Sequence, residues 1–75
     1  MLAVDRTQLT RLLLARLERV SVDSYWAHRA SGVRGALLRE LEKLEAGQSV
    51  DESALKRLID TGFQILERAA RERSR

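Results

Sequence analysis

The stretch WAHRASGVRGALLRELEKL, residues 26–44, contains the clearest periodic pattern in the chain. Its apolar residues recur at spacings of three and four, which is the period of one face of an α-helix and close to that of a coiled-coil seam. The residues of this stripe are Trp26, Ala30, Val33, Leu37, Leu41 and Leu44. The pattern predicts a helix over about residues 24–46, with Gly47 as its C-terminal cap. We expect Trp26, which begins the stripe, to be largely buried against the last helix of the chain.

A shorter helix is predicted before this stretch, over about residues 5–20. Asp5 is a preferred N-cap residue, and Gln8 follows it at the spacing of a capping box. The apolar stripe of this segment consists of Leu9, Leu13, Leu17 and Val20, widened by Leu12 and Leu14. A stripe of this width must be covered by two neighbouring elements.

The third predicted helix covers about residues 50–72. Ser49 and Glu52 have the spacing of a capping box, which predicts that the helix begins there. Its apolar stripe consists of Leu55, Leu58, Ile59, Gly62, Leu66, Ala69 and Ala70, flanked by Phe63 and Ile65. The three segments predict an all-α fold, a small three-helix bundle in which two long helices form an antiparallel hairpin after a shorter N-terminal helix. We expect residues 1–75 to form a single domain, because 75 residues cannot bury a second core.

A subset of these positions is predicted to be structural. The members are Trp26, Val33, Leu37, Leu41, Leu44, Gly62 and Phe63. A glycine within a helix lowers its stability by about 1 kcal/mol relative to alanine. The presence of Gly32 and Gly35 in the second helix therefore calls for an explanation. We favour an intact helix that can kink there. We expect the line of small residues Ala27, Ser31 and Gly35, and also Gly62 in the third helix, to allow close approach between helices.

The composition excludes several kinds of chemistry. The chain has no cysteine, so it has neither disulfides nor thiolate metal ligands, and His28 is its only imidazole. No serine is followed by a base at a recognisable spacing, and a single histidine cannot form a tetrahedral metal site. The sequence therefore predicts a protein that is not an enzyme and has no cofactor and no metal site. The longest run of large aliphatic residues is Leu12 to Leu14, so we expect no membrane segment and a cytoplasmic location.

Charge is distributed unevenly along the chain. Residues 1–39 carry seven arginines against three acids, residues 40–67 carry seven acids against three bases, and residues 68–75 are again basic. A basic block can face an acidic block within one helical fold or between two copies of it. The alternative interpretation is a basic footprint for nucleic acid, which a net charge of +3 permits but does not require.

One surface of the second predicted helix is a candidate binding site. Opposite the apolar stripe, cationic and phenolic side chains surround small residues, and we call this surface the basic face. It consists of Tyr25, His28, Arg29, Gly32, Ala36, Arg39 and Lys43. Small residues there would let a partner helix or a phosphate backbone approach the main chain closely. A basic run of this kind is also common on a purely solvated helix face.

The sequence favours an interaction protein. A core of this size is marginal, and no disulfide or metal supports it, so self-association is expected. We therefore expect a non-enzymatic helical protein–protein interaction or assembly module that forms a homodimer, through surplus apolar surface on the first and third helices, and that binds a protein partner. The alternative is a small nucleic-acid-binding or regulatory protein that uses the arginines of the first two helices.

Overall fold

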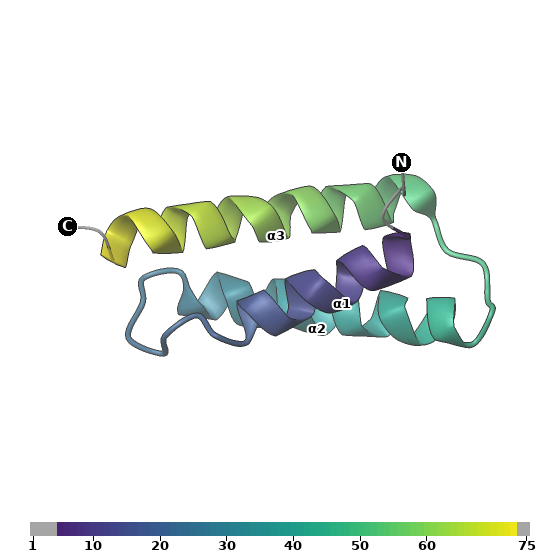
Figure 1. The fold of residues 1–75 in the computed structure, drawn as a ribbon, viewed down its shortest axis with the longest axis horizontal. Coiled ribbons are helices and arrows are strands. Elements are labelled where there is room, and N and C mark those ends of the chain that lie inside the picture. The colour runs from purple at the N-terminus through teal and green to yellow at the C-terminus, as the bar shows by residue number, and fades with distance from the viewer. Residues whose placement is uncertain (1–4, 74–75) are drawn as a thin grey trace.

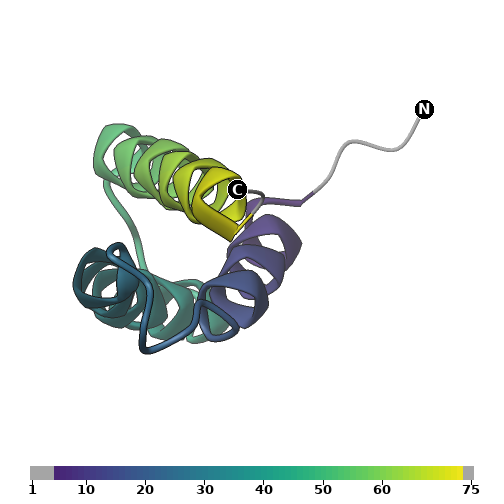
Figure 2. The same ribbon diagram turned by 90° about the vertical axis from the view of Figure 1, so that its left-hand side faces the viewer.

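The computed structural model describes residues 5–73, which form a bundle of three α-helices without strands. The helices are α1 (Arg6–Leu17), α2 (Ala27–Glu45) and α3 (Glu52–Arg73), and each contacts both of the others. Figure 1 shows that α1 and α3 run in the same direction and that α2 runs opposite to both. Viewed along the helices, the three pack around a common centre (Figure 2). The predicted all-α three-helix bundle, with its antiparallel hairpin of two long helices, is confirmed.

The predicted end of the first helix and the predicted start of the second were each wrong by three residues, because the connection between the two helices is longer than expected. Residues 18–26 form a series of turns instead of continuing either helix. Two serine hydroxyls accept backbone hydrogen bonds two residues ahead, Ser21 from the N–H of Asp23 at 3.2 Å and Ser24 from the N–H of Trp26 at 3.0 Å. Such local side-chain bonds compete with helical ones, and they explain why α2 begins only at Ala27.

The predicted start of the third helix was also displaced. Asp51, and not Ser49, precedes the first turn of α3, and its Oδ1 accepts the N–H of Ala54 at 3.2 Å. This is the bond that an N-cap residue makes, and the negative charge of Asp51 also suits the N-terminal end of the helix dipole. At the start of α1, Asp5 caps as predicted, by accepting the N–H of Thr7.

The end of α2 confirms the role predicted for Gly47. Gly47 has a φ of 73°, a conformation that costs glycine little. The N–H of Gln48 donates to the carbonyl of Lys43 at 2.9 Å, and the N–H of Gly47 donates to that of Leu44 at 3.2 Å. These two bonds form a Schellman motif, which stops the helix and turns the chain toward α3.

The core is formed by leucines from all three helices, by one alanine each of α2 and α3, and by an isoleucine of α3. Its buried apolar members are Leu13, Leu14, Leu17, Ala30, Leu37, Leu41, Leu55, Ile65 and Ala69. Thr10 is also fully buried, and its hydroxyl is satisfied because it donates to the carbonyl of Arg6 at 2.7 Å. Apolar periodicity does not predict the burial of Thr10, because a hydroxyl is tolerated in a core only when it has a hydrogen-bond partner, which here is a carbonyl of the same helix.

The residues predicted to be structural fall into three groups. Leu37, Leu41 and Gly62 are buried, whereas Trp26, Val33 and Leu44 are half-buried against the core. The expectation for Phe63 was wrong, since this side chain is 41% exposed and Ile65 on the other side of α3 enters the core instead. Ala70, expected within the buried stripe, is exposed as well. None of the helices that the structure describes is both long and apolar enough to cross a bilayer.

Candidate interaction surfaces

The basic face predicted from the sequence lies on the solvent side of α2. Six of its residues are exposed, and Ala36 is half-buried at its margin. Tyr25 precedes the helix and is 81% exposed. The exposed members in addition to Tyr25 are His28, Arg29, Gly32, Arg39 and Lys43. The basic face is therefore exposed to solvent, and neither α1 nor α3 covers it.

The two glycines of α2 do not serve close packing within the chain. A Cβ added at Gly32 would meet no atom within 4 Å, and one added at Gly35 would meet only Nη1 of Arg39, at 4.0 Å. Helix α2 nevertheless runs uninterrupted through both positions, as favoured from the sequence. The expectation of close helix packing at Gly35 was wrong, because this residue lies on the side of α2 that is turned away from the core.

The charges of the basic face are mixed. Lys43 pairs with Glu40 at 3.3 Å, and Glu42 is exposed one turn after Arg39. Among the described residues, Arg29 and Arg39 take part in no ion pair. The unpaired positive charge that this face offers a ligand is therefore that of two arginines, Arg29 and Arg39.

A second surface lies between α1 and α3, where Leu12 is 48% exposed and Phe63 is 41% exposed. Both side chains line one cavity together with Arg16, Leu66 and Glu67. An adjoining cavity shares Arg16 and Leu66 and continues toward the chain segment after α1, where it is lined by Arg19, Val20, Ser21, Ser24, Ala69 and Ala70. We call this continuous depression the α1–α3 groove.

The α1–α3 groove lies beside a close contact between the two helices. A Cβ added at Gly62 would lie 2.7 Å from Cδ2 of Leu13, so any larger residue at this position would have to displace this buried leucine. Leu12 and Phe63 are the sequence neighbours of these two residues, and they are directed to the outside of the same contact. The sequence signal for the groove was the apolar stripe of the first helix, which is wider than its two neighbours can cover.

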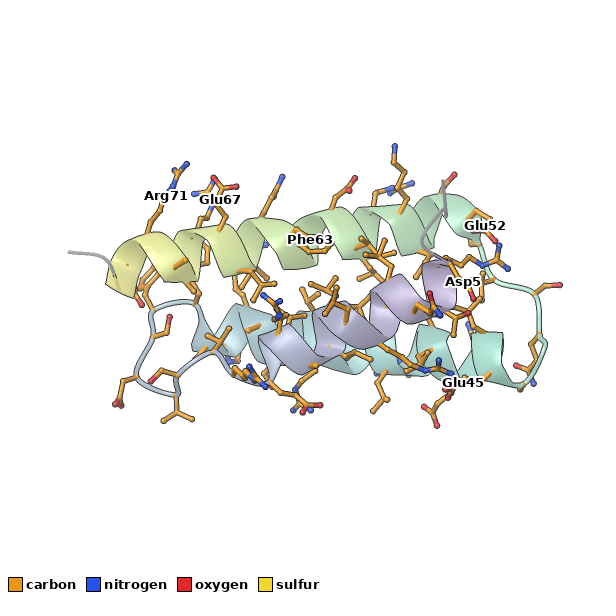
Figure 3. All side chains as sticks on the ribbon, in the orientation of Figure 1. Asp5, Glu45, Glu52, Phe63, Glu67 and Arg71 are labelled. Carbon is orange, nitrogen blue, oxygen red and sulfur yellow. The ribbon has the colours of Figure 1, made fainter. Side chains whose placement is uncertain are left out.

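The two edges of the α1–α3 groove carry opposite charges. Arg16 and Arg19 lie on the α1 side, and Glu67 lies on the α3 side. Oε1 of Glu67 accepts from Nη2 of Arg71 at 2.7 Å, in an exposed pair along α3. Figure 3 shows Glu67 and Arg71 at the edge of α3 that points away from α1. Within the part of the chain that the structure describes, Arg16 forms no ion pair.

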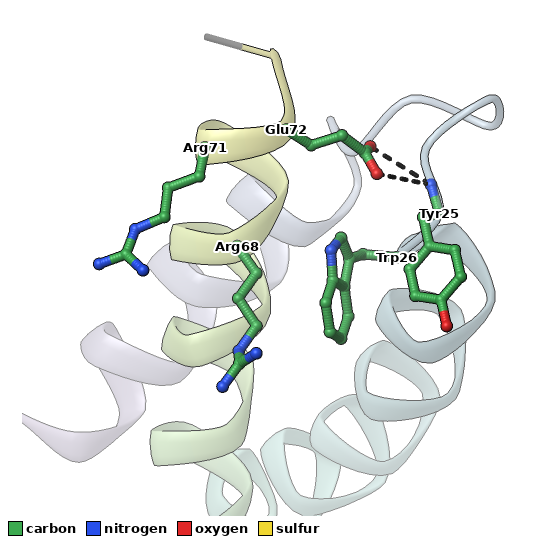
Figure 4. A pocket seen from close by; sticks show the side chains of 5 residues that line it. All are labelled: Tyr25, Trp26, Arg68, Arg71 and Glu72. Atoms are coloured by element: carbon green, nitrogen blue, oxygen red, sulfur yellow. Dashed lines mark hydrogen bonds between the residues drawn. The ribbon is translucent and has the colours of Figure 1, made fainter. Parts of the chain in front are cut away.

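Trp26 closes one end of the bundle, and its expected deep burial was not found. The ring is half-buried, with Tyr25 at 5.4 Å in an edge-on arrangement and the guanidinium carbon of Arg68 at 5.5 Å from the ring centroid (Figure 4). Glu72 accepts the N–H of Tyr25 at 3.2 Å and the hydroxyl of Ser24 at 2.7 Å. These contacts hold the segment before α2 against the end of α3, and Trp26 stays partly exposed because no further element within residues 5–73 covers it.

Ion pairs between helices follow the uneven charge of the sequence. Arg6 pairs with Glu52 at 2.8 Å, and Arg11 pairs with Glu45 at 2.6 Å. Each pair joins the basic first part of the chain to its acidic middle part, which agrees with the interpretation that oppositely charged blocks face one another within the fold. All four side chains are about half exposed, so each pair contributes at most about 1 kcal/mol. Across residues 5–73, no three histidine or carboxylate side chains gather as metal ligands.

Comparison of the chain with protein-family models, with curated proteins and with solved structures gives no match. The function is therefore argued from the surfaces described above.

Proposed function

We propose that this chain is a helical protein-interaction module that acts as a homodimer and that its α1–α3 groove is the self-association surface. The observation that carries the proposal is the exposure of Leu12 and Phe63 side by side at a groove between two helices. Single exposed apolar residues are ordinary, but Leu12, Phe63 and Leu66 line one cavity between two helices, which favours this place as a contact surface.

The size of the protein supports the same proposal. A 75-residue bundle without disulfides buries little apolar surface relative to the entropy lost on folding. Association that covers Leu12 and Phe63 would add burial at the place where the monomer lacks it. Stability would then depend on protein concentration, since a partner that binds only the folded state stabilises it.

The proposal is tested by the mass and the melting temperature of the protein in solution. Sedimentation equilibrium at micromolar concentration and above is expected to give twice the monomer mass, and the melting temperature is expected to rise with concentration. A monomer over the whole range, with a melting temperature independent of concentration, would contradict self-association.

Nucleic-acid binding is the alternative function, and its detection would overturn this proposal. Phosphate contacts weaken steeply with salt, because each neutralised phosphate releases counterions. We expect no submicromolar binding to DNA or RNA at about 0.15 M salt, since Glu40 and Glu42 interrupt the basic face. The matched variant is Arg29→Glu with Arg39→Glu, since both side chains are exposed and unpaired among the described residues. Tight binding that this variant abolishes without loss of helical structure would favour the nucleic-acid function.

A further inference from the structure

We infer that the second copy docks on the α1–α3 groove about a two-fold axis parallel to α1 and α3, so that α1 of each copy faces α3 of the other. The inference rests on the proposed self-association and adds the geometry and the residues of the interface. A homodimer of two identical surfaces has a two-fold axis that lies in the plane of the contact. For a groove between two helices, that axis can run along the helices or across them.

The parallel course of α1 and α3 makes the two arrangements different. The helices run side by side in the same direction (Figure 1), with Arg6 against Glu52 at their N-terminal ends. Rotation about an axis along the helices leaves the position of every residue along that axis unchanged. It places α1 of the second copy opposite α3 of the first, and α3 of the second copy opposite α1 of the first. Leu12 of one copy then meets Phe63 of the other, twice.

Charge selects this arrangement. Arg16 follows Leu12 by four residues, and Glu67 follows Phe63 by four residues, so each charge lies one helical turn beyond its apolar neighbour in the same direction. All four side chains line the same cavity. An axis along the helices therefore places Arg16 of each copy opposite Glu67 of the other copy, beside the apolar contact.

The crosswise arrangement gives neither charge a partner. With an axis across the helices, centred on the same apolar contact, each helix faces its own copy in the opposite direction. Arg16 then lies at the level of Gln8 of the second copy, and Glu67 lies at the level of Ile59, one turn before the apolar contact. Opposite charges across an interface fix its orientation and register, so the axis along the helices is favoured.

The groups required for these ion pairs are available. Arg16 has no ion pair among residues 5–73. Glu67 uses Oε1 for Arg71, and its Oε2 takes part in none of the described hydrogen bonds or ion pairs. The guanidinium of Arg16 is suited to bind a carboxylate in this geometry, because it presents several donors in one plane.

A charge exchange tests the pairing. Arg16→Glu and Glu67→Arg are each expected to weaken the dimer by about tenfold, because each single change places like charges opposite one another. The double variant with both changes is expected to recover most of the lost affinity. Arg57→Glu on α3 is the matched control, since this arginine is also exposed and does not line the groove. Circular dichroism on each variant verifies the fold, and equilibrium sedimentation measures the dissociation constant.

Disulfide cross-linking tests the orientation, because the protein has no cysteine of its own. A mixture of the single variants Leu12→Cys and Phe63→Cys is expected to form mainly the mixed cross-linked dimer under mild oxidation. The crosswise arrangement predicts the opposite, with each variant linking to itself.

The two experiments separate the possible failures. A parent protein that is monomeric overturns the proposed function together with this inference. A parent that is dimeric, but is indifferent to the charge exchange or links Leu12→Cys to itself, retains the proposed function and overturns the interface inferred here.

Discussion

Gly62 in α3 and Gly32 in α2 occupy equivalent local positions, within long helices, but their surroundings are opposite. A Cβ at Gly62 would collide with buried Leu13, whereas a Cβ at Gly32 would enter open space. The α1–α3 contact is therefore a place where packing requires the absence of a side chain. The outer face of α2 carries no such requirement, so its glycines weaken the helix without a packing gain inside the chain.

The largest expected change in stability comes from a comparison of the buried side of the α1–α3 contact with its exposed side. Leu13→Ala is expected to destabilise the protein by about 2–5 kcal/mol, because Leu13 is fully buried and its truncation leaves a cavity. Leu12→Ala, one residue earlier and half exposed, is its control, and it should cost much less at concentrations where the protein is monomeric. Urea unfolding followed by circular dichroism measures both. Equal losses would show that Leu12 is as firmly packed as Leu13.

The comparison of the two glycines is sharpened by making the same substitution at each. Gly62→Ala is expected to destabilise by up to about 2 kcal/mol, since an overpacking cost of about 1–3 kcal/mol exceeds a gain in helix propensity of about 1 kcal/mol. Gly32→Ala should instead stabilise the protein by about 1 kcal/mol. Thermal and urea melts of the two variants should therefore move in opposite directions. Stabilisation by both would mean that Leu13 can move aside freely.

The smallest expected effect concerns the ion pairs at the ends of the helices. Arg11→Gln removes the pair with Glu45 and should cost less than about 1 kcal/mol, because both side chains remain in contact with water. This loss should shrink as salt is raised, since salt screens exposed charges. Arg19→Gln, in the connection after α1 and without an ion pair in residues 5–73, is the control and should change stability less. A loss of stability well above 1 kcal/mol would contradict this expectation and would show that the Arg11–Glu45 pair contributes strongly to the packing of α1 on α2.

The candidate sites were only partly predictable from the sequence. The periodicity of α2 placed the basic face correctly on the solvent side, because the direction of a helical side chain follows from its position in the repeat. The α1–α3 groove was anticipated only as surplus apolar surface on two helices, and Phe63 was assigned to the structure of the core. Its exposure depends on the rotation of α3 relative to α1, which brings Ile65 inward and is a property of the packed pair of helices.

Local patterns along the chain were sufficient to predict the number of helices, their order and the caps at Asp5 and Gly47. Each of these depends on residues within about one turn of one another, so short-range hydrogen bonds and backbone preferences determine them. Long-range packing decided which glycine meets a side chain, whether Trp26 is covered and which of the apolar residues in α1 and α3 remain exposed. These features depend on atoms tens of residues apart, as in the contact of Leu13 with Gly62, and they are set only when the three helices come together.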